Sequence, residues 1–194
     1  MRKMPLPLDR SIFQALIARL EGLHDASGRP IGHGQSVRGG SQTRGGLFQR
    51  MEPEIRAFLR AIEDMIEDYR HALPSEDPTH PLLRHRDRAW AIKGSWSIRM
   101  QGSGRHVAHI HPQGVLSSAA YLVLPDDLGG DSGAGCLELG GPPADLPINL
   151  PPVHLITPEA GFCALFPSTL FHGTRPFAAG HRMTIAFDVA LKPS

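Results

Sequence analysis

The stretch Arg182-Met-Thr-Ile-Ala-Phe-Asp-Val189 alternates between large apolar side chains and polar or small ones. Successive side chains of a β-strand point to opposite faces of the sheet, so this stretch predicts a strand with one apolar face. We expect that face to pack into a core or against helices. The other face carries four side chains that would line a pocket, namely Arg182, Thr184, Ala186 and Asp188.

Short runs of similar character recur from Trp90 onward, separated by Gly, Pro and Asp. Many short strands with frequent turn signals are typical of an all-β sandwich or barrel. The runs are residues 90–100, 105–111, 118–124, 136–139, 153–157, 162–166 and 182–191. We therefore predict a mainly β fold with N-terminal helices, built on a double-stranded β-helix of the jelly-roll, cupin-like kind.

Two amphipathic helices are predicted before this region. Residues 8–23 place leucine and isoleucine at helical spacing, and Gly22 is interpreted as the stop signal. The second helix begins near Pro53, carries an apolar stripe and ends at Leu73-Pro74. We expect both helices to pack on one sheet.

The domain organisation follows from these elements. Residues 28–46 contain seven glycines, which predicts a loop rather than a packed helix. A chain of 194 residues favours a single domain. We expect that domain to span residues 1–194, with a helical region at 1–75 and the β core at 90–194.

Composition excludes several classes of partner. The 20 basic and 19 acidic side chains leave a formal charge of +1, which argues against a nucleic-acid or anionic-membrane partner. Two cysteines are too few for a disulfide framework, and the N-terminal stretch resembles neither a signal peptide nor a membrane span. We therefore expect a cytoplasmic protein. Its oligomeric state is open, with a homodimer as one option.

The eleven histidines are unusually numerous for this length. His109 and His111 are separated by one residue on a predicted strand, so both can face one metal ion. His106 falls on the other face unless a bulge intervenes. A third ligand should come from a distant strand, and His172 is the best candidate because a buried-strand pattern and a turn precede it. Satisfied core or surface histidines are the alternative interpretation.

Arg182 and Thr184 share the predicted pocket-lining face. A guanidinium beside a hydroxyl suits a carboxylate, which accepts two parallel charge-assisted hydrogen bonds and one neutral one. An edge-strand surface position for Arg182 is the alternative.

These residues resemble the motif of the 2-oxoglutarate- and Fe(II)-dependent oxygenases, which is H-x-[DE], a distant His, and an Arg followed by x-[ST]. The corresponding residues are His109-x-His111, His172 and Arg182-x-Thr184. The stretches SVRGGSQT, HIHPQGVLSSAAYLVLP and LFPSTLFHGTRPF are similar to a bacterial subgroup of this superfamily, and the resemblance covers most of residues 36–190.

The resemblance implies Fe(II) and 2-oxoglutarate as cofactors, with His109, His111 and His172 as metal ligands. It places the far carboxylate of 2-oxoglutarate on Arg182 and Thr184, with Tyr121 nearby. The implied reaction is hydroxylation of a C–H bond, coupled to oxidative decarboxylation of 2-oxoglutarate to succinate and CO2.

His111 departs from the family pattern, because most members have Asp or Glu there. The usual site is a facial triad of two histidines and one carboxylate. Three interpretations remain: a working three-histidine iron site, a two-histidine site completed by water or an anion, or an acid supplied from elsewhere in the fold. We favour the first, because Pro112 and Gln113 offer no local carboxylate.

Candidate substrate-binding residues are Arg99, on the strand before the histidines, and Arg38 and Gln42, in the glycine-rich segment. An exterior salt bridge for Arg99 and a solvated loop for the other two are the alternatives. The expected substrate is a small or amino-acid-like molecule. Two other functions are retained: a three-histidine cupin dioxygenase without a keto acid, and a non-redox metal-binding module, with zinc as a candidate ion.

Overall fold

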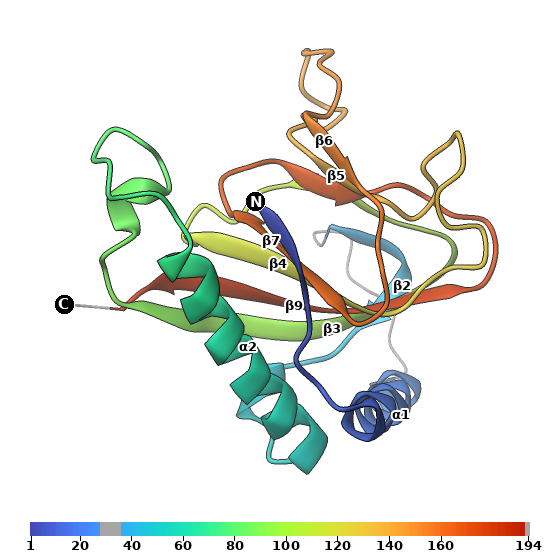
Figure 1. The fold of residues 1–194 in the computed structure, drawn as a ribbon. Helices are drawn as coiled ribbons and strands as arrows, with labels where there is room; N and C mark the ends of the chain where they lie inside the picture. The colour runs from blue at the N-terminus through green and yellow to red at the C-terminus, as the bar shows by residue number, and fades with distance from the viewer. Residues whose placement is uncertain (28–35, 193–194) are drawn as a thin grey trace.

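Nine antiparallel strands form one curled sheet in the computed structural model, which describes residues 1–27 and 36–192 (Figure 1). The strand order is β1-β7-β4-β9-β3-β8-β5-β6, and β2 pairs with β3 beside this path. The strands are β1 (Arg2–Pro5), β2 (Val37–Gln42), β3 (Trp90–His109), β4 (Leu116–Val123), β5 (Leu137–Leu139), β6 (His154–Ile156), β7 (Phe162–Pro167), β8 (His172–Thr174) and β9 (His181–Leu191). The helices are α1 (Arg10–Ser27) and α2 (Pro53–His71), with short 3-10 turns at Leu47–Gln49 and Leu83–His85.

Strand β9 lies between β4 and β3 in the sheet. As predicted, its side chains alternate between the two faces of the sheet. Its apolar side chains, Met183, Ile185, Phe187 and Val189, are fully buried in the main core. Its other face looks into a cavity on the far side of the sheet. The mainly β, double-stranded β-helix prediction is confirmed.

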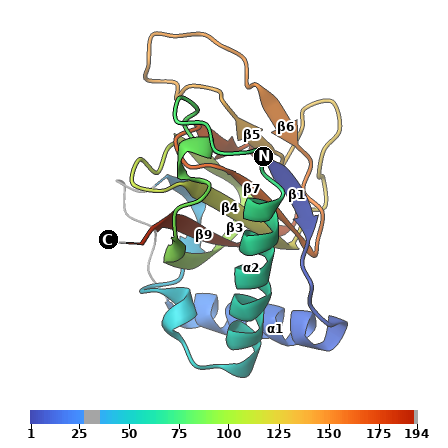
Figure 2. The same ribbon diagram turned by 60° about the vertical axis from the view of Figure 1, so that its left-hand side comes forward.

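Both helices cover the core face of this sheet (Figure 2). Helix α2 begins at Pro53, where a missing backbone N–H costs nothing, and it buries one stripe of apolar side chains. Phe58 from this stripe lies 5.8 Å from Phe48, measured between ring centroids, and Phe48 lies 6.0 Å from Phe187 of β9. This row of aromatic rings fixes the helix layer to the central strand.

Helix α1 continues past Gly22, so the predicted stop at that residue is wrong. Leu16, Leu20 and His24 follow one another at four-residue spacing, and all three are buried. Burial of this stripe outweighs the helix-propensity cost of one glycine, which is about 1 kcal/mol relative to alanine.

The prediction of a loop over the glycine-rich residues 28–46 is also wrong in part. Residues 37–42 form strand β2, paired with β3, rather than a loop. A side chain at Gly40 would place its Cβ 2.3 Å from the carbonyl oxygen of Arg99, so the close strand approach requires glycine. The rest of the predicted loop up to residue 35 lies outside the described residues.

One long strand, β3, replaces two predicted strands. Ser103, between the predicted runs 90–100 and 105–111, adopts a φ of 69°, and the chain continues in the sheet. The short strands β1 and β8 were not predicted, because three or four residues carry too little periodicity to be recognised.

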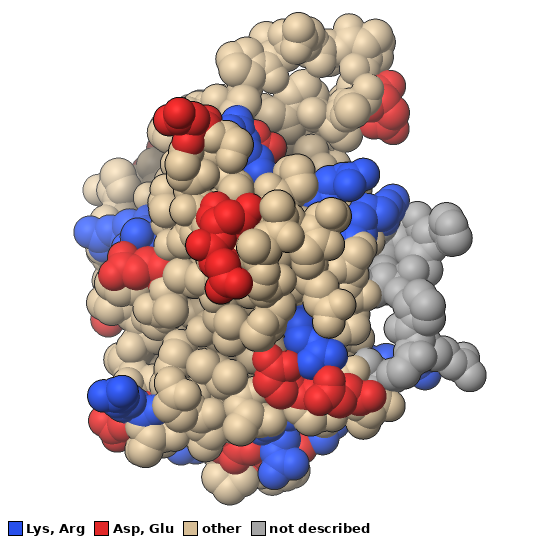
Figure 3. Space-filling view, turned by 90° about the vertical axis from the view of Figure 1, so that its right-hand side faces the viewer, with Lys and Arg blue, Asp and Glu red and all other residues tan. Residues whose placement is uncertain are grey.

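No single sign of charge covers the face in Figure 3, where basic and acidic side chains are interspersed. Within residues 1–27 and 36–192, neither helix is long and apolar enough to cross a membrane.

Replacing Phe58 with alanine should lower the free energy of unfolding by about 3–5 kcal/mol, because it removes a fully buried ring from the helix–sheet contact. Chemical denaturation measures this loss. Arg60→Ala, on the exposed side of the same helix, is the matched control and should change stability by no more than about 0.5 kcal/mol. Equal effects of the two substitutions would contradict the assigned packing.

Candidate metal and carboxylate site

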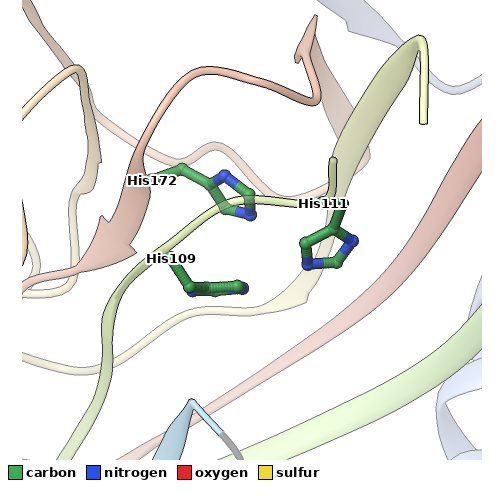
Figure 4. A group of neighbouring side chains, drawn as sticks. All are labelled: His109, His111 and His172. Carbon is green, nitrogen blue, oxygen red and sulfur yellow. The ribbon is translucent and has the colours of Figure 1, made fainter. Parts of the chain in front are cut away.

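Three histidine side chains point toward one another (Figure 4), and all three line one cavity. His109 ends β3 and His172 begins β8, and these two residues are directly paired in the sheet. His111 lies two residues beyond β3. One ligand atom from each ring lies within 4.8 Å of the others, and the ring centroids are 4.3 to 5.2 Å apart. This spacing suits three ligands of one metal ion.

The Nδ1 atom of each ring faces a hydrogen-bond acceptor. His109 donates to the carbonyl oxygen of Val107 at 2.8 Å, and His172 donates to that of Leu170 at 3.0 Å. His111 lies against the carboxylate of Asp188. Because an acceptor at Nδ1 fixes the proton there, each Nε2 keeps its lone pair for a metal.

Burial keeps the two paired histidines neutral at physiological pH. Desolvation is the largest cause and lowers the pKa of His172 to about 3, with the neighbouring His109 adding to the effect. Burial also lowers the pKa of His109 below its ordinary value. Metal ligation requires the neutral imidazole, so these residues are ready to bind an ion without first losing a proton.

Arg182 lies in the same cavity, which has a volume of about 250 Å³. The arginine is 2% exposed, and its Nη1 donates to Thr174 Oγ1 at 3.2 Å. Its Nε and the hydroxyl of Tyr121 are buried without a hydrogen-bond partner among residues 1–27 and 36–192. The guanidinium carbon lies 5.4 Å from the centre of the Tyr121 ring.

No carboxylate among the described residues forms an ion pair with Arg182. Burial accordingly lowers the pKa of the guanidinium, which reflects the cost of removing an unpaired cation from water. An anionic ligand in the cavity would offset this cost. Thr184 lines the same cavity, so the predicted carboxylate-binding pair does lie together.

His106 also lines the cavity, although simple alternation placed it on the opposite face. The register between β3 and β8 shifts between His106 and His109, which turns both side chains to one side. The Nε2 atom of His106 is buried without a partner. Sequence reasoning allowed for a bulge here but had no signal to locate one.

Two further residues were missed as site residues. Thr174 lies in β8, which was not predicted as a strand, and its hydroxyl contacts Arg182. Asp188 was expected on the pocket face, but its contact with His111 depends on the pairing of β3, β9 and β4. Neither contact follows from local sequence.

The three predicted substrate residues are placed differently from one another. Gln42 lines the cavity. Arg38 is not among the lining residues, and its Nη1 donates to the carbonyl oxygen of Val37 at 3.0 Å. Arg99 lies on the opposite face of β3, where Nη1 contacts Glu21 at 2.5 Å and Asp25 at 2.7 Å. This is the salt-bridge alternative for Arg99.

His24 links helix α1 to the strands that carry the site. Its Nδ1 contacts Ser41 Oγ at 2.8 Å and its Nε2 contacts Ser97 Oγ at 3.0 Å. Burial, followed by the charge of Arg99, lowers the pKa of His24 to about 4.

The unfolded chain therefore binds more protons at this residue than the folded chain between about pH 4 and 6.5. The stability that His24 contributes should be complete above pH 6.5 and be lost as the pH falls toward 4, by at most about 1.4 kcal/mol per pH unit. In His24→Gln, unfolding free energies measured from pH 7.5 to 4.5 should show a shallower slope than in the unmodified protein. His154→Gln, at an exposed position, should retain the original slope. An unchanged slope in His24→Gln would contradict the buried neutral histidine.

Comparison with known proteins is consistent with this geometry. Residues 94–188 match the model of a protein family described as "Putative 2OG-Fe(II) oxygenase". No curated protein sequence matches the chain significantly.

Solved structures with the same fold include three oxygenases. A Pseudomonas putida prolyl-4-hydroxylase is 17% identical, with a TM-score of 0.62 over 99% of this chain and 92% of that one. HygX from Streptomyces hygroscopicus, solved with nickel, 2-oxoglutarate and hygromycin B, is 13% identical, with a TM-score of 0.64 over 98% and 82%. A collagen prolyl hydroxylase of Paramecium Bursaria Chlorella virus-1, in complex with 2-oxoglutarate, is 15% identical, with a TM-score of 0.61 over 98% and 96%.

Proposed function

We propose that this chain, a member of the 2-oxoglutarate- and Fe(II)-dependent oxygenases, binds iron through His109, His111 and His172 and binds 2-oxoglutarate through Arg182. The enzyme is a 2-oxoglutarate-dependent hydroxylase. One observation carries the residue assignment: a buried guanidinium, which has no carboxylate partner among the described residues, shares a small cavity with three convergent imidazoles. A three-histidine dioxygenase without a keto acid would instead consume oxygen without forming succinate.

The imidazole set fits Fe(II). Three neutral nitrogen donors are compatible with this ion and leave coordination positions open for other ligands. Iron in this position would supply the oxygen chemistry that couples hydroxylation to decarboxylation of 2-oxoglutarate to succinate and CO2. The role of the chain is to hold the ion, orient the co-substrate and exclude water.

Arg182 and Thr184 line the same cavity as the three histidines and would bind the far carboxylate of 2-oxoglutarate. Arg182 would donate charge-assisted hydrogen bonds to it, and Thr184 would add a hydroxyl donor. Burial raises the pKa of Tyr121, so its unpartnered phenol stays protonated and would donate a further hydrogen bond. We propose that Thr174 keeps the guanidinium in place through its contact with Nη1.

The substrate would approach from the part of the cavity lined by Gln42 and Trp96. We propose a small or amino-acid-like substrate, with Gln42 as a contact and Arg38 on the same strand nearby. The near-neutral net charge supports this substrate class over a nucleic acid. Arg99 is not included, because its side chain is engaged by Glu21 and Asp25. The two buried cysteines are free thiols, which supports a cytoplasmic location.

Anaerobic titration of the Fe(II) protein with 2-oxoglutarate should produce a visible metal-to-ligand charge-transfer band. Arg182→Ala should weaken co-substrate binding by at least about 30-fold, which corresponds to the roughly 2 kcal/mol lower limit for losing one partner of a buried charge pair. The exposed Arg60→Ala serves as the control and should bind as the unmodified protein does.

Metal affinity should stay unchanged in Arg182→Ala, which separates loss of the co-substrate from loss of the fold. An unchanged 2-oxoglutarate affinity in this variant would refute the assigned carboxylate site.

A further inference from the structure

The three imidazoles differ in what holds their Nδ1 atoms. His109 and His172 each donate to a backbone carbonyl two residues earlier in the chain. His111 instead contacts the side-chain carboxylate of Asp188, which belongs to the central strand β9. Two of the partners are therefore backbone carbonyls, and one is an acidic side chain.

Asp188 is held firmly in this position. Ser117 Oγ of β4 donates to Asp188 Oδ1 at 2.8 Å, while Oδ2 faces His111. No lysine or arginine in the described part of the chain forms an ion pair with this carboxylate. The ring of Trp96 also stacks on the ring of His111, at a centroid distance of 5.8 Å and an angle of 29°. The imidazole is thus fixed by both packing and charge.

The charge of the metal site indicates what the contact between Asp188 and His111 could do. Three neutral imidazoles would leave a divalent ion with two uncompensated positive charges, whereas two histidines and one carboxylate would leave one. A carboxylate hydrogen-bonded to a ligating histidine fixes its tautomer and raises the basicity of the ligand nitrogen. In this chain the histidine with such a partner is the one beyond the end of β3, outside the regular sheet pairing.

We propose that Asp188 is a positioning residue for the metal centre: it holds His111 as the Nδ1–H tautomer, and its negative charge takes the place of a carboxylate ligand by acting through the imidazole. This inference rests on the metal site of the proposed function. It adds a fourth residue to that site, one hydrogen bond away from the ligand His111.

Asp188→Asn tests the charge while nearly preserving the shape. Cobalt(II) affinity, followed by visible absorption under anaerobic conditions, should fall by about 10- to 100-fold, the usual effect of removing a partner of this kind. The Fe(III)/Fe(II) midpoint potential should rise, because the lost charge stabilises Fe(III) more than Fe(II). Asp131→Asn, at an exposed position, is the matched control and should change neither value. Unchanged affinity and potential in a folded Asp188→Asn protein would overturn the proposal.

A second measurement keeps the proposal testable if the variant does not fold. Nitrogen-15 spectra of the unmodified, metal-free protein should show His111 with its proton on Nδ1 and a strongly hydrogen-bonded proton resonance. Zinc replaces cobalt in this measurement because zinc is diamagnetic. When zinc is added, the proton of His111 should stay on Nδ1 and the Nε2 resonance should shift. A proton on Nε2 in the metal-free protein would overturn the proposal.

The outcomes separate this inference from the proposed function. Metal binding that depends on Asp188, without any 2-oxoglutarate-dependent absorption band, would refute the co-substrate assignment and support the role of Asp188. A charge-transfer band, together with a metal affinity and a midpoint potential that Asp188→Asn leaves unchanged, would support the co-substrate assignment and refute the role of Asp188. Absence of metal binding in the unmodified protein would refute both.

Discussion

The direct pairing of His109 with His172 across β3 and β8 is the constraint on which the site depends. These residues are far apart in sequence, and a regular sheet pair brings their roots within a few ångströms of each other. His111 joins them from the chain immediately after β3. Backbone carbonyls and one carboxylate then occupy the Nδ1 atoms, so the three Nε2 atoms are left for an ion. The geometry is therefore set by the fold before any metal binds.

A second constraint is the cost of burying Arg182. A cation at 2% exposure with an unpartnered Nε destabilises the fold unless something in the cavity compensates it. The opposite face of β9 is filled with apolar side chains that pack against the helices, which prevents the guanidinium from reaching solvent that way. An anion that bound in this cavity and relieved the buried charge would also stabilise the folded state.

Sequence periodicity predicted the features that depend on two-residue alternation. These include the two faces of residues 182–189 and the shared direction of His109 and His111. It could not place His106, because a one-residue shift of register moves a side chain to the other face and leaves no local signal. Nor could it predict strand β2. Its glycines indicate a loop when only the local sequence is considered, whereas in the fold Gly40 is required for the close approach of β2 to β3. The contact of Asp188 with His111 needs three strands in correct order, which only the tertiary structure provides.

The most direct measurement is a crystal structure of the protein grown without oxygen in the presence of Fe(II) and 2-oxoglutarate. Our account predicts one iron bound by the Nε2 atoms of His109, His111 and His172, the far carboxylate of 2-oxoglutarate on Arg182, and Asp188 still hydrogen-bonded to His111. Iron coordinated elsewhere, or 2-oxoglutarate bound with its carboxylate away from Arg182, would contradict it.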